Sequence, residues 1–286
     1  MSQIVYLNGG LIPFSQALIS VLDYGFLFGF GLFETMRAYR GQVFRLDRHL
    51  SRLASSAKML GLSLETPELK AAVMDTIAAN NLGDARIRIT ISAGEGSITP
   101  DPSTCHRPTV LILAEHYQPH PEKVYQRGFR AVVSSIHRNS QSPLSRLKTT
   151  SYLESVLARE EARAAGADEA LLLNERGLLA EASMSNIFLV SDGGLKTPGQ
   201  ESGLLPGITR ETVLELASQL SINALECDVR RDELFQAQEA FLTNSLIEIM
   251  PLTEVNGKPI GSGKPGAVTQ RFMLAYTDLV LAESSA

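Results

Sequence analysis

The sequence predicts an α+β fold, and three observations lead to that prediction. Helical and strand periodicities alternate along the 286 residues, hairpin-like turns separate many of the strands, and no glycine-rich dinucleotide fingerprint follows a strand. A doubly wound parallel sheet is therefore disfavoured. With 44% hydrophobic residues, the chain is apolar enough to bury a substantial core and long enough for two modest domains.

The first half of the chain contains two predicted helices. A short strand at residues 4–7 comes first and leads into a glycine-rich turn. Asp47 is the predicted N-cap of a helix that ends at Gly61, because apolar residues then recur on one helical face. Thr66, followed by proline and glutamate, begins a second helix, and Gly83 lies beyond its end.

Two strands complete the predicted N-terminal domain. Residues 85–92 alternate strictly, with isoleucine at every second position, and residues 108–117 form a further strand. The segment 118–122 contains two prolines and is typical of a short stiff linker. The sequence therefore predicts a small N-terminal α/β domain at residues 1–117 and a larger C-terminal domain at residues 123–286.

The second half is predicted to mix three helices with several strands. Its first helix occupies residues 149–165, its second follows the turn at residues 203–210, and its third occupies residues 267–282. The predicted strands occupy residues 129–136, 169–173, 178–181, 187–190, 222–229, 240–243 and 247–255.

Composition and charge exclude several classes of protein. A net charge of −5 and a pI near 5.6 argue against nucleic acid as the main partner. Cys105 and Cys227 are far apart and lack metal-ligand spacing, so we expect no metal site and a reduced, intracellular protein. The N-terminus has no signal-peptide pattern, and no stretch of about 18 apolar residues exists. A cytoplasmic protein with no membrane partner is the expectation.

Lys148 and Glu181 together indicate pyridoxal phosphate chemistry. A lysine ahead of an alanine-rich helix can form a Schiff base with an aldehyde cofactor, and a carboxylate on a later strand can keep a pyridine nitrogen protonated. Each residue alone has an ordinary alternative, a solvated lysine or an exposed strand glutamate. The hypothesis rests on their combination with nearby phosphate-binding candidates.

Those phosphate candidates lie on both sides of the pair. The segment 205–210 opens onto a helix, whose N-terminal N–H groups and positive dipole end suit a phosphate, and Thr209 adds a hydroxyl. The residues 243–245 offer small donors at the end of a strand, and Arg52 could supply charge. The alternatives are a simple helix cap, a polar turn and an exposed helix arginine.

The order of these motifs resembles that of the class IV, fold-type IV pyridoxal-phosphate enzymes, over nearly the whole chain. This family includes branched-chain aminotransferases, D-amino-acid aminotransferases and 4-amino-4-deoxychorismate lyases. The motifs that carry the resemblance are Asp23-Tyr24-Gly25-Phe26-Leu27-Phe28-Gly29, Gly31-Leu32-Phe33-Glu34-Thr35-Met36-Arg37, His49-Leu50-Ser51-Arg52-Leu53, Arg146-Leu147-Lys148-Thr149, Glu181-Ala182-Ser183-Met184-Ser185-Asn186, Leu205-Pro206-Gly207-Ile208-Thr209-Arg210 and Phe241-Leu242-Thr243-Asn244-Ser245.

The resemblance implies a fold, a cofactor and roles for residues. It implies two α/β domains with pyridoxal 5′-phosphate in the cleft between them, the C-terminal domain being the cofactor-binding one, and a homodimer whose loops complete each pocket. Lys148 would be the Schiff-base lysine, Glu181 the partner of the pyridine nitrogen and Tyr152 a contact of the phenolic oxygen. The phosphate would be held by Arg52, Ile208, Thr209 and Ser245.

The reaction is predicted to be that of 4-amino-4-deoxychorismate lyase, which gives 4-aminobenzoate and pyruvate. Residues 33–37, 85–94, 146–153 and 243–246 are most similar to that branch. The alternative is an amino-acid transaminase for branched-chain or D-amino acids with 2-oxoglutarate or pyruvate as acceptor. A dimer without catalytic activity is disfavoured because Lys148 and Glu181 are both present.

Three residues are the chosen candidates for the substrate pocket. Arg88 is the first candidate for the substrate carboxylate, because a guanidinium is a planar bidentate donor. Arg37 follows, with Arg86 and Arg138 as further possibilities, although Arg86 and Arg88 could simply solvate one face of a strand. Phe33 is expected to wall the pocket, unless it belongs to the core.

Overall fold

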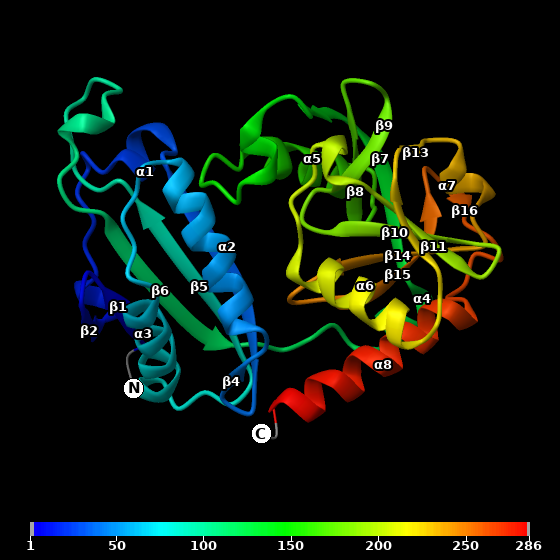
Figure 1. Cartoon of the computed structure of the whole chain (residues 1–286), viewed down its shortest axis with the longest axis horizontal. Helices are drawn as coiled ribbons and strands as arrows, with labels where there is room; N and C mark the ends of the chain where they lie inside the picture. The colour runs from blue at the N-terminus through cyan, green and yellow to red at the C-terminus, as the bar shows by residue number, and fades with distance from the viewer. Residues whose placement is uncertain (1–2, 285–286) are drawn as a thin grey trace. The chain divides into compact units, whose positions relative to one another are not determined.

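The computed structural model describes residues 3–284, which divide into two compact units (Figure 1). Unit 1 contains the described residues up to Gln118 together with Leu147–Ser151 and the last two described residues. Unit 2 contains Pro119–Arg146 and Tyr152–Ala282. The sequence placed residues 147–151 in the C-terminal domain, whereas their contacts assign them to unit 1.

Unit 1 contains a six-stranded sheet in the order β2-β1-β6-β5-β3-β4. Its neighbouring strands are antiparallel, and β3 pairs with β5 along eight residues of register. The predicted strand at residues 85–92 matches β5, whereas the long strand β3 was not predicted. The strands are β1 (Ile4–Leu7), β2 (Gly10–Pro13), β3 (Gly31–Tyr39), β4 (Gln42–Val43), β5 (Ala85–Ser92) and β6 (Thr109–His116).

Two helices cover one face of this sheet, α2 (Leu46–Met59) and α3 (Thr66–Ala79). The helix α2 contacts β3 and α3, and α3 contacts β1 and β6. Because side chains alternate along a strand, β5 turns its three isoleucines into the core, where they are fully buried. The short helix α1 (Tyr24–Phe28) precedes β3. The predicted N-cap was wrong: Arg45, in the left-handed region at φ 54°, precedes α2, and Asp47 lies inside the first turn.

Unit 2 contains a ten-stranded sheet along the path β12-β11-β10-β14-β15-β7-β8-β9-β13, with β16 paired to β15. The predicted strand at residues 222–229 is two short strands, and β11 was not predicted. The strands are β7 (Phe129–Arg138), β8 (Glu169–Asn174), β9 (Leu178–Ala182), β10 (Asn186–Ser191), β11 (Gly194–Pro198), β12 (Ala224–Cys227), β13 (Val229–Arg230), β14 (Glu239–Asn244), β15 (Glu248–Val255) and β16 (Lys258–Pro259).

Three long helices accompany this sheet. The helix α5 (Leu153–Ala164) packs its buried alanines on β8, α6 (Ile208–Gln219) contacts β14, and α8 (Ala267–Ser284) places Phe272 against Phe241. The short helices are α4 (Glu122–Arg127) and α7 (Glu233–Gln236). The helix predicted at residues 149–165 begins only at Leu153, because residues 149–151 are extended.

The predicted α+β class is confirmed, since each unit joins a sheet with separate helices. The chain contains turns at the positions where the sequence placed them, including the left-handed glycines Gly61 and Gly166 after α2 and α5. Over residues 3–284, no helix combines the length and the apolar character that crossing a bilayer requires.

Candidate active site

Lys148 lies on an extended segment that pairs with the edge of β3. The Phe33 N–H donates to the Lys148 carbonyl at 2.8 Å, and the Thr150 N–H donates to the Gly31 carbonyl at 2.9 Å. An antiparallel bridge joins Leu32 to Thr149. These bonds cover the part of the β3 edge that the short strand β4 leaves unpaired. The backbone of Lys148 is therefore fixed by the sheet and not by the helix that follows it.

The ring of Phe33 joins Lys148 to Arg88. The Lys148 Nζ lies 4.5 Å from the ring centre, and the Arg88 guanidinium carbon lies 3.8 Å from it. Arg88 Nε also donates to the hydroxyl of Thr90 at 3.2 Å. Both ring contacts are within the range of cation–π attraction. Unit 1 thus brings three of the predicted residues together, and Phe33, only 3% exposed, forms their common contact.

The two other arginine candidates on this sheet differ in their surroundings. The guanidinium of Arg37 lies 4.4 Å from the ring centre of Tyr39 and 4.9 Å from that of Tyr117. Arg86 is half exposed and forms an ion pair with Glu115. Arg86 therefore behaves as a solvated surface residue, which was the ordinary alternative for it.

Arg52 lies on the inner side of α2, with its side chain 14% exposed. Its Nε and Nη2 both donate to the carboxylate of Glu34 on β3, at 2.8 and 2.7 Å. His49, one helical turn earlier, contacts the same carboxylate through Nδ1 at 2.8 Å. The sequence pattern placed Arg52 on the polar side of the helix and gave no sign of its two buried partners.

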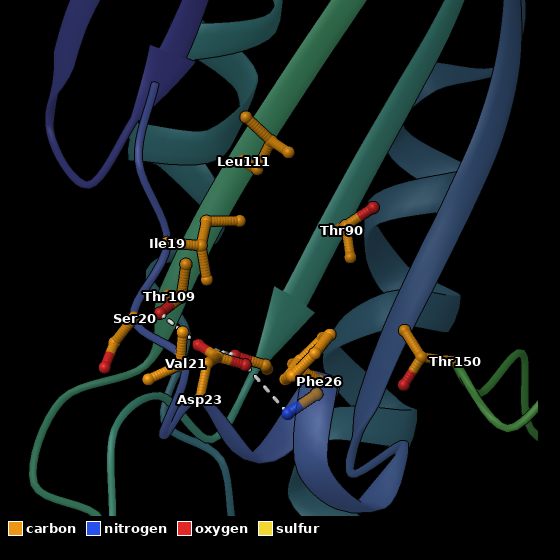
Figure 2. A pocket seen from close by; sticks show the side chains of 11 residues that line it. Ile19, Ser20, Val21, Asp23, Phe26, Thr90, Thr109, Leu111 and Thr150 are labelled. Atoms are coloured by element: carbon orange, nitrogen blue, oxygen red, sulfur yellow. Dashed lines mark hydrogen bonds between the residues drawn. The ribbon is translucent and has the colours of Figure 1, made fainter. Parts of the chain in front are cut away.

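Unit 1 also contains a cavity of about 290 Å³, but no predicted site residue lines it. Figure 2 shows Asp23 and Thr109 pointing toward each other at its wall. The Asp23 carboxylate accepts hydrogen bonds from the hydroxyls of Thr109 and Ser92 and from the N–H of Gly25, at 2.7–2.8 Å. Thr150 lines it too, so the cavity adjoins the Lys148 segment without containing Lys148 itself.

In unit 2, each carboxylate oxygen of Glu181 on β9 has a partner. Arg138 Nη2 lies 3.0 Å from Oε1, and the N–H of Leu205 donates to Oε2 at 3.1 Å. Glu181 is only 8% exposed. Arg138 and the N–H dipole of Leu205 compensate the charge that water cannot reach. Arg138 had been considered for the substrate carboxylate, whereas the structure pairs it with Glu181.

Tyr152 lies in the same neighbourhood as Glu181. Its hydroxyl donates to the carbonyl of Ser183 at 3.1 Å, in the turn that follows β9. Burial and then the negative charge of Glu181 raise the pKa of Tyr152 to about 12. The phenol is therefore a neutral hydrogen-bond donor at physiological pH. This role was implied for Tyr152 only by the family resemblance.

The N-terminus of α6 has the features of an anion cradle. Gly207 precedes the helix without a side-chain cap, which leaves the first-turn N–H groups of Ile208 and Thr209 available to a ligand. A Cβ at Gly207 would meet Asn186 Oδ1 at 2.0 Å, so a larger residue would force Asn186 or the backbone to shift. Asn186 in turn donates to the Leu205 carbonyl at 2.9 Å and holds the segment in place.

A second group of small polar residues lies on β14 and its turn. Thr243 pairs with Asn186 in the sheet register, and its hydroxyl is buried without a hydrogen-bond partner. Asn244 donates to the Met184 carbonyl at 3.1 Å and accepts from the N–H groups of Leu246 and Ile247, which shapes the turn containing Ser245. A buried hydroxyl of this kind is usually satisfied by a ligand or water.

These two sets of residues fit pyridoxal phosphate. Unit 1 supplies a lysine amine on a fixed backbone and Arg52, and unit 2 supplies a charge-compensated carboxylate, a neutral phenol and an uncapped helix N-terminus. In unit 1 the lysine matches an aldehyde and Arg52 a phosphate. In unit 2 the carboxylate matches a pyridine nitrogen, the phenol a phenolic oxygen and the helix N-terminus a phosphate. Within residues 3–284, no group of three or more His, Cys, Asp or Glu side chains could hold a metal ion.

Sequence comparison leads to the same class of enzyme. Residues 31–255 match the family model for amino-transferase class IV. A putative branched-chain-amino-acid aminotransferase of Methanocaldococcus jannaschii is 38% identical over 96% of both chains. A D-alanine aminotransferase of Bacillus licheniformis is 31% identical over 98% of both chains.

Solved structures agree with the sequence relatives. The branched-chain aminotransferase of Thermoproteus uzoniensis with norvaline has a TM-score of 0.91 and 38% identity, over 99% of this chain and 96% of the other. A branched-chain amino acid aminotransferase of Escherichia coli has a TM-score of 0.93 and 32% identity, over 98% and 95% of the two chains. Another enzyme of that name was solved with pyridoxamine 5′-phosphate and also has a TM-score of 0.93.

The fold and the family match define a pyridoxal-phosphate enzyme of fold type IV. The chain belongs to the class IV aminotransferase family, and its cofactor is pyridoxal 5′-phosphate. The predictions of family, fold class, cofactor and enzymatic nature are thereby confirmed.

The leading prediction of a 4-amino-4-deoxychorismate lyase is wrong. The relatives that match nearly the full chain at 32–38% identity are branched-chain aminotransferases. The prediction gave weight to residues 33–37, which include Thr35 and Met36. In β3 these residues keep the strand alternation, with Met36 fully buried in the core and Thr35 opposite Arg88.

Proposed function

We propose that this enzyme is an amino-acid transaminase that takes its amino group from a branched-chain or similar hydrophobic L-amino acid. A 2-oxo acid, 2-oxoglutarate or pyruvate, would be the acceptor. The observation that carries this proposal is the near full-length similarity to branched-chain aminotransferases, at 38% identity for two of them. The proposal replaces the lyase reaction with the alternative that the sequence left open.

Within that reaction, we assign roles to residues of both units. Lys148 Nζ would bind the cofactor aldehyde and later carry the proton that leaves the substrate Cα. Glu181 would accept a hydrogen bond from the pyridine nitrogen, and Tyr152 would turn its hydroxyl from the Ser183 carbonyl to donate to the phenolic oxygen. Arg52, the first-turn N–H groups of α6 with Thr209, and Ser245 would hold the phosphate. When bound, the cofactor ring supplies the electron sink for the substrate carbanion.

Arg88 is proposed to bind the substrate carboxylate. In an α-amino acid the carboxylate is attached to the carbon that loses its proton, so its binding group must lie near the proton-transfer amine. Arg88 and Lys148 contact the same ring of Phe33, at 3.8 and 4.5 Å from its centre, which supports this pairing. Arg37, flanked by two tyrosine rings, is the second candidate. Phe33 would then form the wall beneath both charges.

A D-amino acid donor is the second candidate function, supported by the D-alanine aminotransferase relative. The two donors differ only in the hand of Cα, so their assay decides between them. Purified, cofactor-loaded protein is given a panel of L- and D-amino acids with 2-oxoglutarate or pyruvate. Fast transfer from L-leucine, L-valine or L-isoleucine supports the first proposal. Transfer only from D-amino acids establishes the second, and transfer from neither overturns both.

We also propose a homodimer that works in the cytoplasm. In unit 1, the segment before β3 exposes several large apolar side chains, including Leu18 at 82%, Val21 at 73% and Phe26 at 75%. Exposed apolar groups that gather in one segment are typical of an interface. Unpaired Cys105 and Cys227 suit a reducing compartment. Light scattering tests the dimer, and Phe26→Ser is expected to weaken it.

A further inference from the structure

Three polar side chains form a buried cluster beneath α2. Glu34 lies on the core side of β3, beside Leu32 and Met36, and is 1% exposed. His49 and Arg52 reach it from α2, three residues apart on one helical face. We call Glu34, His49 and Arg52 the Glu34 cluster. Its neighbours on this face of β3 and β5 are hydrophobic, so the position of a carboxylate here requires a reason.

Stability is a poor reason for burying this carboxylate. Removing two charged groups from water costs several kcal/mol, and a buried ion pair often gives no net gain over apolar residues of similar size. The cluster compensates that cost locally: burial alone would raise the pKa of Glu34, but Arg52 and His49 lower it to about 2. Glu34 is therefore ionised at physiological pH although it is almost inaccessible to water.

The geometry of the Glu34–Arg52 contact fixes the orientation of one guanidinium. Two parallel hydrogen bonds, from Nε to Oε1 and from Nη2 to Oε2, define the plane of the Arg52 head group. His49 Nδ1 contacts Oε2 as well and prevents the carboxylate from rotating. Arg52 itself keeps 14% of its side chain exposed, so it is the one member of the Glu34 cluster that reaches the surface.

His49 serves in this cluster as a neutral donor. Burial lowers the pKa of His49, the Glu34 carboxylate raises it, and the charges of Arg52 and Lys148 lower it further. A neutral imidazole donates one N–H to Glu34 without adding a second positive charge to the cluster. The influence of Lys148 on this pKa also indicates that the Glu34 cluster lies near the lysine segment within unit 1.

We propose that Glu34 is a positioning residue that orients Arg52 for the phosphate of the cofactor. The inference rests on the proposed role of Arg52 in phosphate binding, and it adds that Glu34 acts on the phosphate through Arg52. A flexible arginine would lose side-chain entropy on binding phosphate, whereas a guanidinium already held in one plane loses less. The carboxylate also reduces the net positive charge of the site. Neutralising Glu34 should therefore lower phosphate affinity if its role is to orient Arg52, and raise phosphate affinity if its negative charge matters more.

The test compares two ligands of the cofactor-free protein, pyridoxal phosphate and pyridoxal, by calorimetry. Pyridoxal lacks the phosphate, so the ratio of the two affinities reports phosphate recognition alone. For Glu34→Gln we expect a loss of about tenfold in pyridoxal phosphate affinity, comparable to one charge-assisted hydrogen bond, with pyridoxal binding nearly unchanged. Thr76→Val, a buried polar-to-apolar change on α3, is the matched control and should leave the ratio as it is.

Further variants separate the possible failures. If Arg52→Ala leaves the affinity ratio unchanged, the phosphate role of Arg52 is wrong and the inference fails with it. If Arg52→Ala lowers the ratio and Glu34→Gln does not, only the positioning role is overturned. Tighter phosphate binding by Glu34→Gln would mean that its charge, not its orientation of Arg52, matters. Glu34→Asp, which keeps the charge but cannot span the same fork, serves if the glutamine variant does not fold, and should also lower the ratio.

Discussion

Arg138 places its Nη2 3.0 Å from the Oε1 of Glu181, and the same nitrogen donates to the carbonyl of Ser145 at 2.9 Å. The guanidinium also reaches Glu154 through Nη1 at 3.2 Å. Arg138 is thus held from several directions while it compensates the charge of Glu181. Because Glu181 is proposed to hold the pyridine nitrogen, we expect Arg138 to influence the reaction through Glu181.

The Arg138–Glu181 pair should act as a unit in catalysis. We expect Arg138→Met to lower kcat about 10- to 100-fold, as for the loss of a hydrogen bond between charged groups. Glu181→Gln should lower kcat as well, with little loss of bound cofactor. The kcat of the double variant should equal that of Glu181→Gln alone, because Arg138 is expected to act only through Glu181. Fully additive losses in this double-mutant cycle would show that Arg138 acts by another route.

Lys148→Ala should abolish turnover and the covalent attachment of cofactor while leaving the fold intact. The backbone bonds that Lys148 makes with β3 do not involve its side chain. Borohydride reduction followed by peptide mapping measures the attachment, and far-UV circular dichroism measures the fold. Lys58→Ala, at an exposed position near the end of α2, is the control and should be fully active. Retained activity above a few per cent of wild type would refute the assignment.

Phe33→Leu should lower kcat/KM by about tenfold. Leucine keeps much of the buried apolar volume but removes the ring face that Lys148 and Arg88 share, and each cation–π contact contributes about 0.5–2 kcal/mol. Steady-state kinetics with an L-amino acid donor measure the loss. Phe44→Leu is the matched control, since Phe44 is a buried aromatic that contacts Arg45. Equal losses in both variants would point to general core damage.

Gly207→Ala should weaken cofactor binding because the new Cβ would meet Asn186 Oδ1 at 2.0 Å. Relief requires a shift of Asn186 or of the α6 N-terminus, and either shift disturbs the phosphate cradle. Equilibrium dialysis with pyridoxal phosphate measures the affinity. Gly83→Ala introduces the same methyl group where no atom lies within 4 Å, so it should bind normally. Normal affinity in Gly207→Ala would remove the α6 N-terminus from the proposed site.

Because the pKa of Tyr152 is raised, we expect the free energy of unfolding to fall at alkaline pH. Its pKa is raised from 10.0 to about 12, first by burial and then by Glu181. Between these two values the unfolded state has lost the proton and the folded state keeps it, so the free energy of unfolding falls as pH rises through this window. The contribution is at most about 2–3 kcal/mol. Urea unfolding at the two ends of the window measures it, and Tyr152→Phe should show a smaller fall.

Much of the secondary structure could be predicted because periodicity reports which side chains are buried. The strict alternation of residues 85–92 identified β5, and the proline after Thr66 identified the start of α3. The strand β3 was missed because it is buried along most of its length, which removes the alternating signal. Arg45 was missed as the residue before α2 because its left-handed backbone conformation has no side-chain signature.

The candidate site could be predicted only as separate motifs. Lys148 and Glu181 stood out because their chemistry is specific, whereas the pairing of Glu181 with Arg138 depends on a long-range contact. The spacing of His49 and Arg52 could have shown that both lie on one helical face. The burial of Glu34 between Leu32 and Met36 could not be predicted, because β3 itself was missed. The reaction was predicted wrongly, because weight was given to residues 33–37, which lie on β3 and include the buried core residue Met36.

The pairing of the Lys148 segment with β3 also limits how this enzyme can be recombined with its relatives. A hybrid gene joined near residue 118 would take Phe33 from one parent and Lys148 from the other, although the two are hydrogen-bonded neighbours in one folding unit. Exchanging residues 147–151 together with the first unit would preserve that neighbourhood. The natural module for swapping is therefore discontinuous in the gene, and a fragment that ends at Gln118 omits a strand-like piece of its own sheet.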